Sequence, residues 1–271
     1  RVEGHKVQID FTVTEELSVI TAVDYAVDRT KDWQTLLPDD EVYDSRTERI
    51  HAEITIEEAG SQLLFLRPRR FGKSLWLSTL ENYYDLARAD DFERLFGGLK
   101  IGQNPTPRHN RYFILNLNFS VVDPHGDSDA VRASLFHHLN IQIKATVARY
   151  SDWLEDRVDI EPDDGIASFQ SLTNAIAQTP YKLYLLVDEY DNFANEVMIS
   201  PLHGTDRYQR LVENEGTIKT FFKAVKAAAE GRGVDRVFLT GISPVVLSDI
   251  TSGYNVAEDL SQRPRFHDLC G

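Results

Sequence analysis

Four short apolar runs recur along the chain, and each is followed by polar residues. They occupy residues 62–66, 112–119, 182–187 and 236–240. Their apolarity is mostly continuous, which is typical of strands that are buried on both faces of a parallel sheet. The pattern therefore predicts at least four strands covered on both sides.

Segments with helical spacing of their apolar residues lie among these runs. They cover residues 73–86, 130–150, 165–178 and the region 206–230. Strands that alternate with helices predict an α/β fold of three layers, with a mostly parallel sheet between two layers of helices. Because ligands bind at the carboxyl ends of the strands in such sheets, chemistry is expected just after each apolar run.

Composition narrows the class of protein. The 271 residues include 43 Asp and Glu against 29 Lys and Arg, so the formal charge is 29 − 43 = −14. The hydrophobic fraction of 42 % and the charged fraction of 27 % are those of an ordinary soluble globular protein. The single cysteine, Cys270, excludes a disulfide scaffold and a multi-cysteine zinc site.

Some partners and compartments follow from these figures. No stretch of the sequence approaches the roughly 18 unbroken apolar residues of a membrane span, so no membrane partner is expected. The cysteine usage fits an intracellular compartment, with cytoplasm or nucleus left open. The acidic charge gives no support to nucleic-acid binding by a whole face, but it leaves room for a local basic pocket.

The residues after the first run form a basic loop that opens a predicted helix. Their sequence, RPRRFGKS, matches the phosphate-binding pattern G-x-x-x-x-G-K-[ST] at Gly72, Lys73 and Ser74, with Arg67 at the first glycine position. Gly72 lets backbone N–H groups close on phosphate oxygens at the start of a helix. Lys73 is predicted to reach the β- and γ-phosphates of a nucleotide, and the Ser74 hydroxyl to bind Mg²⁺.

Charge supports this interpretation independently of the pattern. Residues 67–73 hold four cations and no acid, a local charge of +4 in a chain of −14, and clustered cations need an anion to balance them. The predicted nucleotide-binding residues of the loop are Arg67, Arg69, Arg70, Phe71, Gly72, Lys73, Ser74 and Leu75. The alternative is a solvated basic turn. For Arg69 and Arg70, ion pairs with the acidic surface and a role across a subunit interface also stay open.

The third run ends in two carboxylates, Asp188 and Glu189. Four apolar residues followed by Asp-Glu are the Walker B pattern of ATPases that use a catalytic glutamate. Asp188 is predicted to hold Mg²⁺, and Glu189 to orient or deprotonate the attacking water. The alternative is that an acid at the end of a strand caps the following helix.

Polar residues also end the second and fourth runs. In P-loop ATPases with a strand inserted between the two Walker motifs, a polar residue after that strand senses the γ-phosphate and helps to place the water. Thr240 is the first candidate for this role and Ser243 the second. Asn116 and Asn118 lie two residues apart and therefore share one strand face, so one of them is expected to point toward the nucleotide.

At RPRRFGKS the chain resembles the AAA-ATPase-like family, whose P-loop domains are often joined to a C-terminal PD-(D/E)XK nuclease-like domain. An arginine at the first glycine position is usual in that family, so Arg67 becomes a match. Further segments are similar to family motifs in the same order: residues 25–30 (YAVDRT), 117–120 (LNFS), 186–191 (LVDEYD), 240–244 (TGISP) and 252–255 (SGYN). The resemblance implies a three-layer P-loop NTPase fold with a strand inserted between the Walker A and Walker B strands. It also implies that Asp28 borders the adenine pocket.

The domain organisation follows from the same comparison. We expect residues 1–60 to form an N-terminal extension that packs on a P-loop domain of residues 61–271. The sole methionine is Met198, so the chain is expected to be a fragment of a longer protein.

Two functional hypotheses remain. In the first, a Mg²⁺-dependent ATPase module uses Lys73, Glu189 and Thr240 as catalytic residues and drives or gates an attached effector domain. In the second, the module is a nucleotide-binding switch or interaction module with negligible hydrolysis, linked to nucleic-acid processing. ATP is favoured over GTP because the guanine-binding motif N-K-x-D is absent from the sequence. Oligomerisation is left open.

Overall fold

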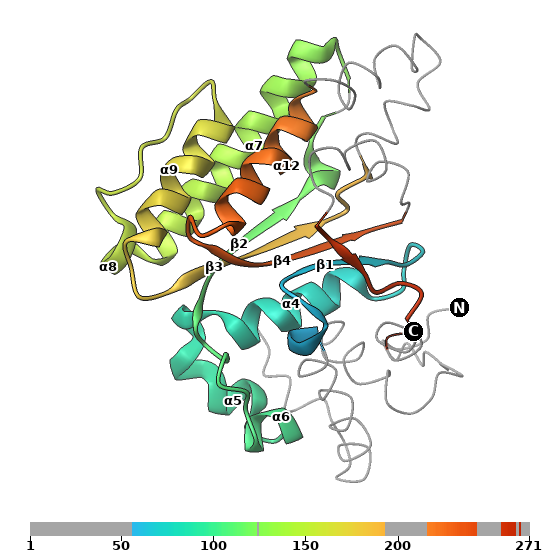
Figure 1. The fold of residues 1–271 in the computed structure, drawn as a ribbon, viewed down its shortest axis with the longest axis vertical. Coiled ribbons are helices and arrows are strands. Elements are labelled where there is room, and N and C mark those ends of the chain that lie inside the picture. Colours follow the sequence, from blue (N-terminus) through green and yellow to red (C-terminus); the bar gives the residue numbers. More distant parts are fainter. Residues whose placement is uncertain (1–55, 124, 193–215, 243–255, 264–265, 267–271) are drawn as a thin grey trace, which may run out of the picture.

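A five-stranded parallel sheet forms the centre of the protein (Figure 1). The computed structural model describes residues 56–123, 125–192, 216–242, 256–263 and 266. The strands are β1 (Gln62–Leu66), β2 (Tyr112–Asn118), β3 (Lys182–Asp188), β4 (Val234–Gly241) and β5 (Glu258–Asp259). The four predicted strands are confirmed, and the two-residue β5 is an addition that was too short to leave an apolar run.

The order of the strands is β2-β3-β4-β1-β5, so β4 lies between β1 and β3. Phe65 of β1 pairs with Thr240 of β4, and Val187 of β3 pairs with Leu239. The strand that precedes the basic loop and the strand that ends in the two carboxylates are therefore separated by one inserted strand. This arrangement confirms the predicted P-loop NTPase-like fold.

Helices cover both faces of the sheet, which makes three layers (Figure 1). One layer contains α4 (Lys73–Tyr84), η3 (Leu86–Asp91), α5 (Phe92–Phe96) and α6 (Lys100–Gln103). The other contains α7 (Ser128–Arg149), α8 (Ser151–Leu154), α9 (Gly165–Ala177) and α12 (Thr217–Ala229). A single turn, η4 (Phe119–Val121), follows β2. The predicted helices over 73–86, 130–150 and 165–178 are confirmed, and the described part of the fourth region begins at α12.

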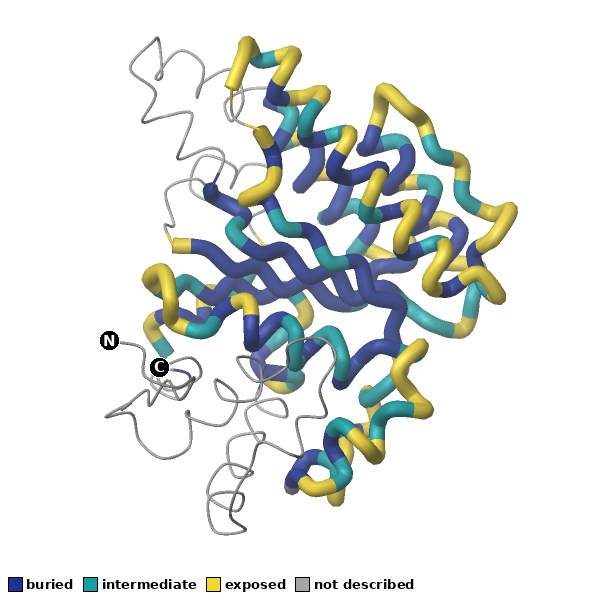
Figure 2. The backbone as a smooth tube through the Cα atoms, turned by 180° about the vertical axis from the view of Figure 1, so that it is seen from behind, coloured by how far each residue is buried: buried dark blue, intermediate teal, exposed yellow. Residues whose placement is uncertain are grey.

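Each face of the sheet contributes to its own hydrophobic core, because successive strand side chains point to opposite sides. Leu117, Leu185 and Leu239 pack with the helices α7, α9 and α12. Phe65 and Phe238 pack with α4 on the other side. Figure 2 shows the consequence, with buried strands in the middle and exposed positions on the outer sides of the helices and in the connecting loops. Burial on both faces explains why the strands are almost continuously apolar.

The predicted boundary at residue 60 stays a prediction, because residues 1–55 lie outside the described part of the chain. Ile56, at the described end of the predicted extension, is fully buried in the core beside α4. Its carbonyl accepts a hydrogen bond of 3.0 Å from the buried Arg236 guanidinium. Among the described helices, none is at once long enough and apolar enough to span a bilayer.

A buried carboxylate joins α4, β2 and α7. Asp85 follows α4, is 0 % exposed, and accepts hydrogen bonds from the Tyr150 hydroxyl at 2.7 Å and from the Ala87 N–H at 2.8 Å. The same hydroxyl accepts the buried N–H of Ile114 in β2 at 2.8 Å. Arg149 lies 3.3 Å from the other carboxylate oxygen. Burial nevertheless raises the pKa of the Asp85 carboxyl, because desolvation outweighs these partners.

Replacement of Tyr150 by Phe is expected to lower the free energy of unfolding by about 1–3 kcal/mol. The change removes one donor from a buried carboxylate and leaves the Ile114 N–H without its acceptor. Urea denaturation at neutral pH measures the effect. Tyr181→Phe is the matched control, because that ring is only half-buried and its stability change should stay within about 0.5 kcal/mol. Equal losses in the two variants would contradict the role assigned to the Tyr150 hydroxyl.

Candidate active site

The basic loop, residues 67–72, connects β1 to α4 at the carboxyl edge of the sheet. Gly72 is the N-cap of α4 and has a φ of 76°, a left-handed conformation that favours glycine. A Cβ at this position would have no atom within 4 Å, so the backbone conformation, and not crowding, requires the glycine. Gly72 has no side chain to cap the first turn of α4, and the N–H groups at the start of a helix favour an anion.

The Lys73 side chain turns back beneath this loop. It is only 5 % exposed, and its ammonium donates hydrogen bonds of 3.0 Å to the carbonyl oxygens of Arg67 and Pro68. A buried ammonium requires such acceptors, because burial without partners is costly. The loop is thus wrapped around the cation that the sequence predicts to bind phosphate.

The Asp188 carboxylate connects three elements of the sheet edge. It is 4 % exposed and accepts the Ser74 hydroxyl of α4 at 2.6 Å and the Thr240 hydroxyl of β4 at 2.5 Å, one on each oxygen. The N–H of Glu189 donates to the second of these oxygens at 3.0 Å. Hydrogen bonds as short as these are among the stronger ones in proteins. The structure therefore brings together three of the residues predicted to be catalytic or metal-binding, from parts of the chain far apart in sequence.

Glu189 leaves the end of β3 in a left-handed conformation, with a φ of 49°. Burial raises the pKa of its carboxyl, and the neighbouring Asp188 carboxylate raises the pKa further. The positive charges of Lys73 and Arg69 act in the opposite direction, which places Glu189 within the field of the basic loop. A carboxyl with a raised pKa beside a basic loop has properties that suit a general base.

Asp191 is a site residue that the sequence interpretation missed. It is 1 % exposed, and its carboxylate oxygens accept the N–H of Ile242 at 3.1 and 3.3 Å, which ties the turn after β3 to the end of β4. A Cβ on Gly241 would lie 2.6 Å from an Asp191 oxygen, so the close approach requires glycine there. The motif LVDEYD contains Asp191, but no sequence pattern distinguishes a buried structural carboxylate from a solvated one.

The remaining loop residues are placed differently from one another. The guanidinium of Arg67 donates to backbone carbonyls away from the loop. Arg69, Arg70 and Phe71, in contrast, are exposed to solvent. Leu75 is 8 % exposed. The nucleotide contacts predicted for all of these residues remain predictions.

The two asparagines of β2 have protein partners in the structure. Asn116 donates to Glu81 of α4 at 2.9 Å, and the Asn118 side chain accepts the N–H of Ser120 at 2.9 Å. The role of one of them toward the nucleotide remains a prediction. Asp28 and Ser243 lie outside the described residues.

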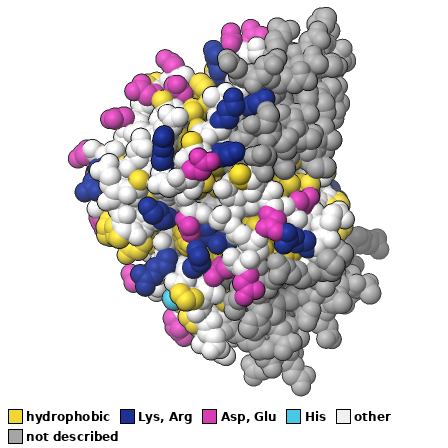
Figure 3. All heavy atoms as spheres, in the orientation of Figure 1, with side chains coloured by type: hydrophobic (Ala, Val, Ile, Leu, Met, Phe, Trp, Pro, Cys, Tyr) yellow, Lys and Arg dark blue, Asp and Glu magenta, His cyan; other side chains and the backbone are white. Residues whose placement is uncertain are grey.

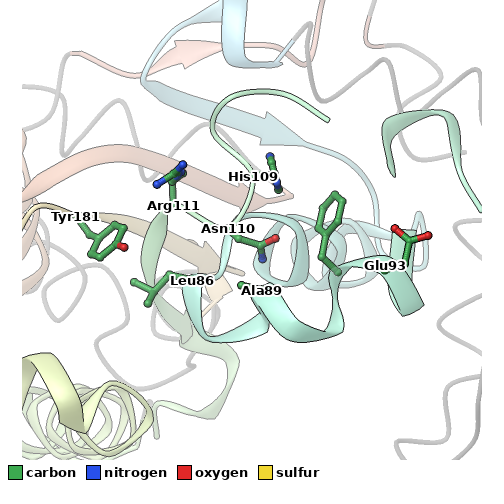
Figure 4. A pocket seen from close by; sticks show the side chains of 8 residues that line it. Leu86, Ala89, Glu93, His109, Asn110, Arg111 and Tyr181 are labelled. Atoms are coloured by element: carbon green, nitrogen blue, oxygen red, sulfur yellow. The ribbon is translucent and has the colours of Figure 1, made fainter. Parts of the chain in front are cut away.

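A hollow at the opposite edge of the sheet is separate from these residues (Figure 4). It lies beside the beginnings of β2 and β3 and is lined by residues such as Phe92, His109, Arg111 and Tyr181. Parallel sheets bind their ligands at the carboxyl ends of the strands, so this hollow is not the predicted nucleotide site.

Figure 3 shows basic and acidic side chains interspersed over the face seen in Figure 1.

Comparison with known proteins agrees with this geometry. Residues 29–251 match the model of the AAA-ATPase-like family, described as predicted AAA-ATPases, and the match spans 251 − 29 + 1 = 223 of the 271 residues. The chain belongs to this family. A search of curated proteins found no match. The family supports an ATPase-like function in general, with use of ATP, and the nuclease-like partner domain stays a prediction. In this AAA-ATPase-like chain, the predicted phosphate loop (the basic loop together with Lys73, residues 67–73), Asp188 and Thr240 all lie inside the matched region.

Replacement of Thr240 by Val is expected to lower the free energy of unfolding by about 1.5–3 kcal/mol, because the buried Asp188 carboxylate loses a short hydrogen bond. Thr240→Ser keeps the hydroxyl and should cost about 1 kcal/mol or less. Urea denaturation measures both. Thr173→Val is a matched control, since Thr173 is equally buried but donates only to a backbone carbonyl of its own helix. The assignment fails when the Val and Ser variants of Thr240 are equally stable.

Proposed function

We propose that this chain is a Mg²⁺-dependent ATPase module that hydrolyses ATP to drive or gate an attached effector domain. The observation that carries the proposal is the Asp188 carboxylate, held between the Ser74 hydroxyl of the phosphate loop helix and the Thr240 hydroxyl of the inserted strand. Family membership supports ATP as the ligand. Hydrolysis and the requirement for magnesium are the parts that experiment must test.

The donor set near the phosphate loop suits magnesium. A serine hydroxyl and a carboxylate are hard oxygen ligands, and they already lie within 2.6 Å of each other. Mg²⁺ commonly takes only one or two protein ligands and completes its shell with water and substrate phosphates. Ser74 and Asp188 would hold the ion, which would neutralise charge on the β- and γ-phosphates.

The residues of the loop would bind the nucleotide phosphates. Lys73 now donates to two loop carbonyls, and phosphate oxygens are stronger acceptors that would replace them. The uncapped N–H groups at the start of α4 would bind the same phosphates, with Gly72 allowing the close approach. The exposed Arg69 and Arg70 would offset charge at the outer phosphate.

Glu189 and Thr240 would act on the water and on the metal ligand, respectively. The Glu189 carboxylate would accept a proton from, or orient, the water that attacks the γ-phosphorus. Thr240 donates to Asp188 in this structure, so its supported role is to fix that carboxylate. Little covalent work is required of the protein, since positioning and electrostatic stabilisation dominate phosphoryl transfer.

The variant Glu189→Gln is expected to bind Mg²⁺-ATP as the wild type does but to release phosphate at least about 100-fold more slowly, because the amide cannot accept the proton. Calorimetric titration gives binding and a phosphate assay gives turnover. Glu93→Gln on the exposed surface of α5 is the control and should leave both binding and turnover unchanged.

Lys73→Ala should weaken ATP binding about 10- to 100-fold through the loss of a charged hydrogen-bond donor. The same calorimetric titration measures this loss.

Two outcomes would change the proposal. Unchanged turnover in Glu189→Gln would remove the role given to that carboxylate. Tight ATP binding by the wild type without phosphate release would favour the alternative, a nucleotide-binding switch with negligible hydrolysis.

The pH dependence of kcat/KM is expected to report Glu189. A base must be ionised, so activity falls as the pH falls through its pKa, and the raised pKa moves this acid limb above the pH at which an ordinary glutamate would titrate. Arg69 lowers that pKa, so Arg69→Ala should move the limb to higher pH, whereas Arg88→Ala, in η3 beyond the C-terminal end of α4, should not. A limb that moves to lower pH in Arg69→Ala would contradict the assignment.

A further inference from the structure

A short C-terminal segment, residues 256–263 together with Phe266, lies along the outer edge of β1. Its strand β5 pairs with β1 in parallel, and the N–H of Leu260 donates to the Leu64 carbonyl at 2.9 Å. Leu260 and Phe266 are each 0 % exposed and belong to the core on the α4 side. The family match ends at residue 251, so this segment lies beyond the matched region.

The segment forms hydrogen bonds with the last residue of β1 and with the first residue of the phosphate loop. The N–H of Leu66 donates to the Ser261 hydroxyl at 2.8 Å. The Arg67 guanidinium donates to the carbonyls of Ser261 at 3.1 Å and Phe266 at 2.9 Å, and also to the carbonyl of Leu66 at 2.9 Å. The guanidinium carbon of Arg67, Cζ, lies 4.4 Å from the centre of the Phe65 ring. Only the planar, several-donor head of arginine satisfies such a set of acceptors from one position.

The main chain of Arg67 lies in the candidate active site at the same time. Its N–H donates to the Gly241 carbonyl at 3.1 Å, at the residue after Thr240. Its carbonyl accepts one of the two hydrogen bonds of the Lys73 ammonium, at 3.0 Å. One residue therefore contacts the lysine of the phosphate loop through its backbone and the C-terminal segment through its side chain.

We infer that Arg67 is a positioning residue through which the C-terminal segment orders the phosphate loop. A glycine, the usual residue of the phosphate-loop pattern at this position, would leave the loop without this connection. The side chain does not need to contact a phosphate, because its donors are directed at the carbonyls of Ser261 and Phe266. The effect on nucleotide binding rests on the proposed function, whereas the effect on loop order does not.

Hydrogen–deuterium exchange of the full chain without nucleotide tests the structural part. Arg67→Gly and Arg67→Lys remove hydrogen bonds to the segment, and Ser261→Ala removes the acceptor of the neighbouring Leu66 N–H. Each variant should raise the exchange rate about tenfold or more, both in residues 256–263 and in residues 68–74. Arg263→Ala is the matched control, because it removes only an exposed ion pair with Glu258 of the same segment and should stay within about twofold of wild type. Faster exchange in the segment with unchanged exchange in the loop would overturn the inference.

The affinity for Mg²⁺-ATP separates positioning from direct phosphate binding. Arg67→Lys keeps the charge but not the fork of donors, so positioning predicts that it weakens binding as much as Arg67→Gly does, and that Ser261→Ala weakens binding as well. In all three variants KM should rise about tenfold while kcat stays within about threefold. Retained affinity in Arg67→Lys and in Ser261→Ala would show a phosphate ligand instead and overturn the inference. If the wild type binds no ATP, the proposed function fails, and the exchange rates alone decide the role of Arg67.

Discussion

The buried carboxylate of Asp188 is the interaction on which the geometry of the candidate site depends. A polar group at 4 % exposure is costly unless donors replace its water, and here the donors come from α4, β4 and the chain just after β3. A donor from β4 can reach Asp188 only because β4 is the direct neighbour of β3. A donor from α4 can reach it because α4 begins at the same edge of the sheet, one strand further on. Strand order and the hydrogen bonds of a single carboxylate are thus two aspects of one arrangement.

The sequence predicted those parts of the molecule that repeat a local pattern. Strands buried on both faces are continuous apolar runs, and the loop with Gly72 and Lys73 is recognisable because phosphate binding requires residue types at fixed spacing. The strand β5 was not predicted, because two residues are too few to show a periodic pattern. The partners of Arg67 could not be predicted from the sequence. They are the backbone carbonyls of Ser261 and Phe266, nearly 200 positions away, and backbone carbonyls are present at every residue.

The charge of the phosphate loop takes on a different meaning in three dimensions. Its formal charge of +4 suggested four cations that need an anion to balance them, but two of these cations already have hydrogen-bond acceptors in the protein. Arg67 donates to carbonyls of β1 and of the C-terminal segment, and Lys73 donates to carbonyls of the loop itself. Arg69 and Arg70 are exposed to solvent. The loop therefore combines a structural cation, a buried and preorganised cation, and two solvated ones, which differ in what an incoming phosphate would have to displace.

The left-handed turn at Glu189 shows how the site maintains an unfavourable backbone conformation. A non-glycine residue with a φ of 49° costs about 1–2 kcal/mol, and such residues persist only where their surroundings determine them. Here the N–H of Glu189 donates to Asp188, and the next N–H, of Tyr190, donates to the Thr240 carbonyl at 3.0 Å. Asp191 then holds the end of β4. These bonds offset the strain, and because they also join β3 to β4, the direction in which Glu189 leaves its strand is determined by the same contacts that hold the carboxyl edge of the sheet together.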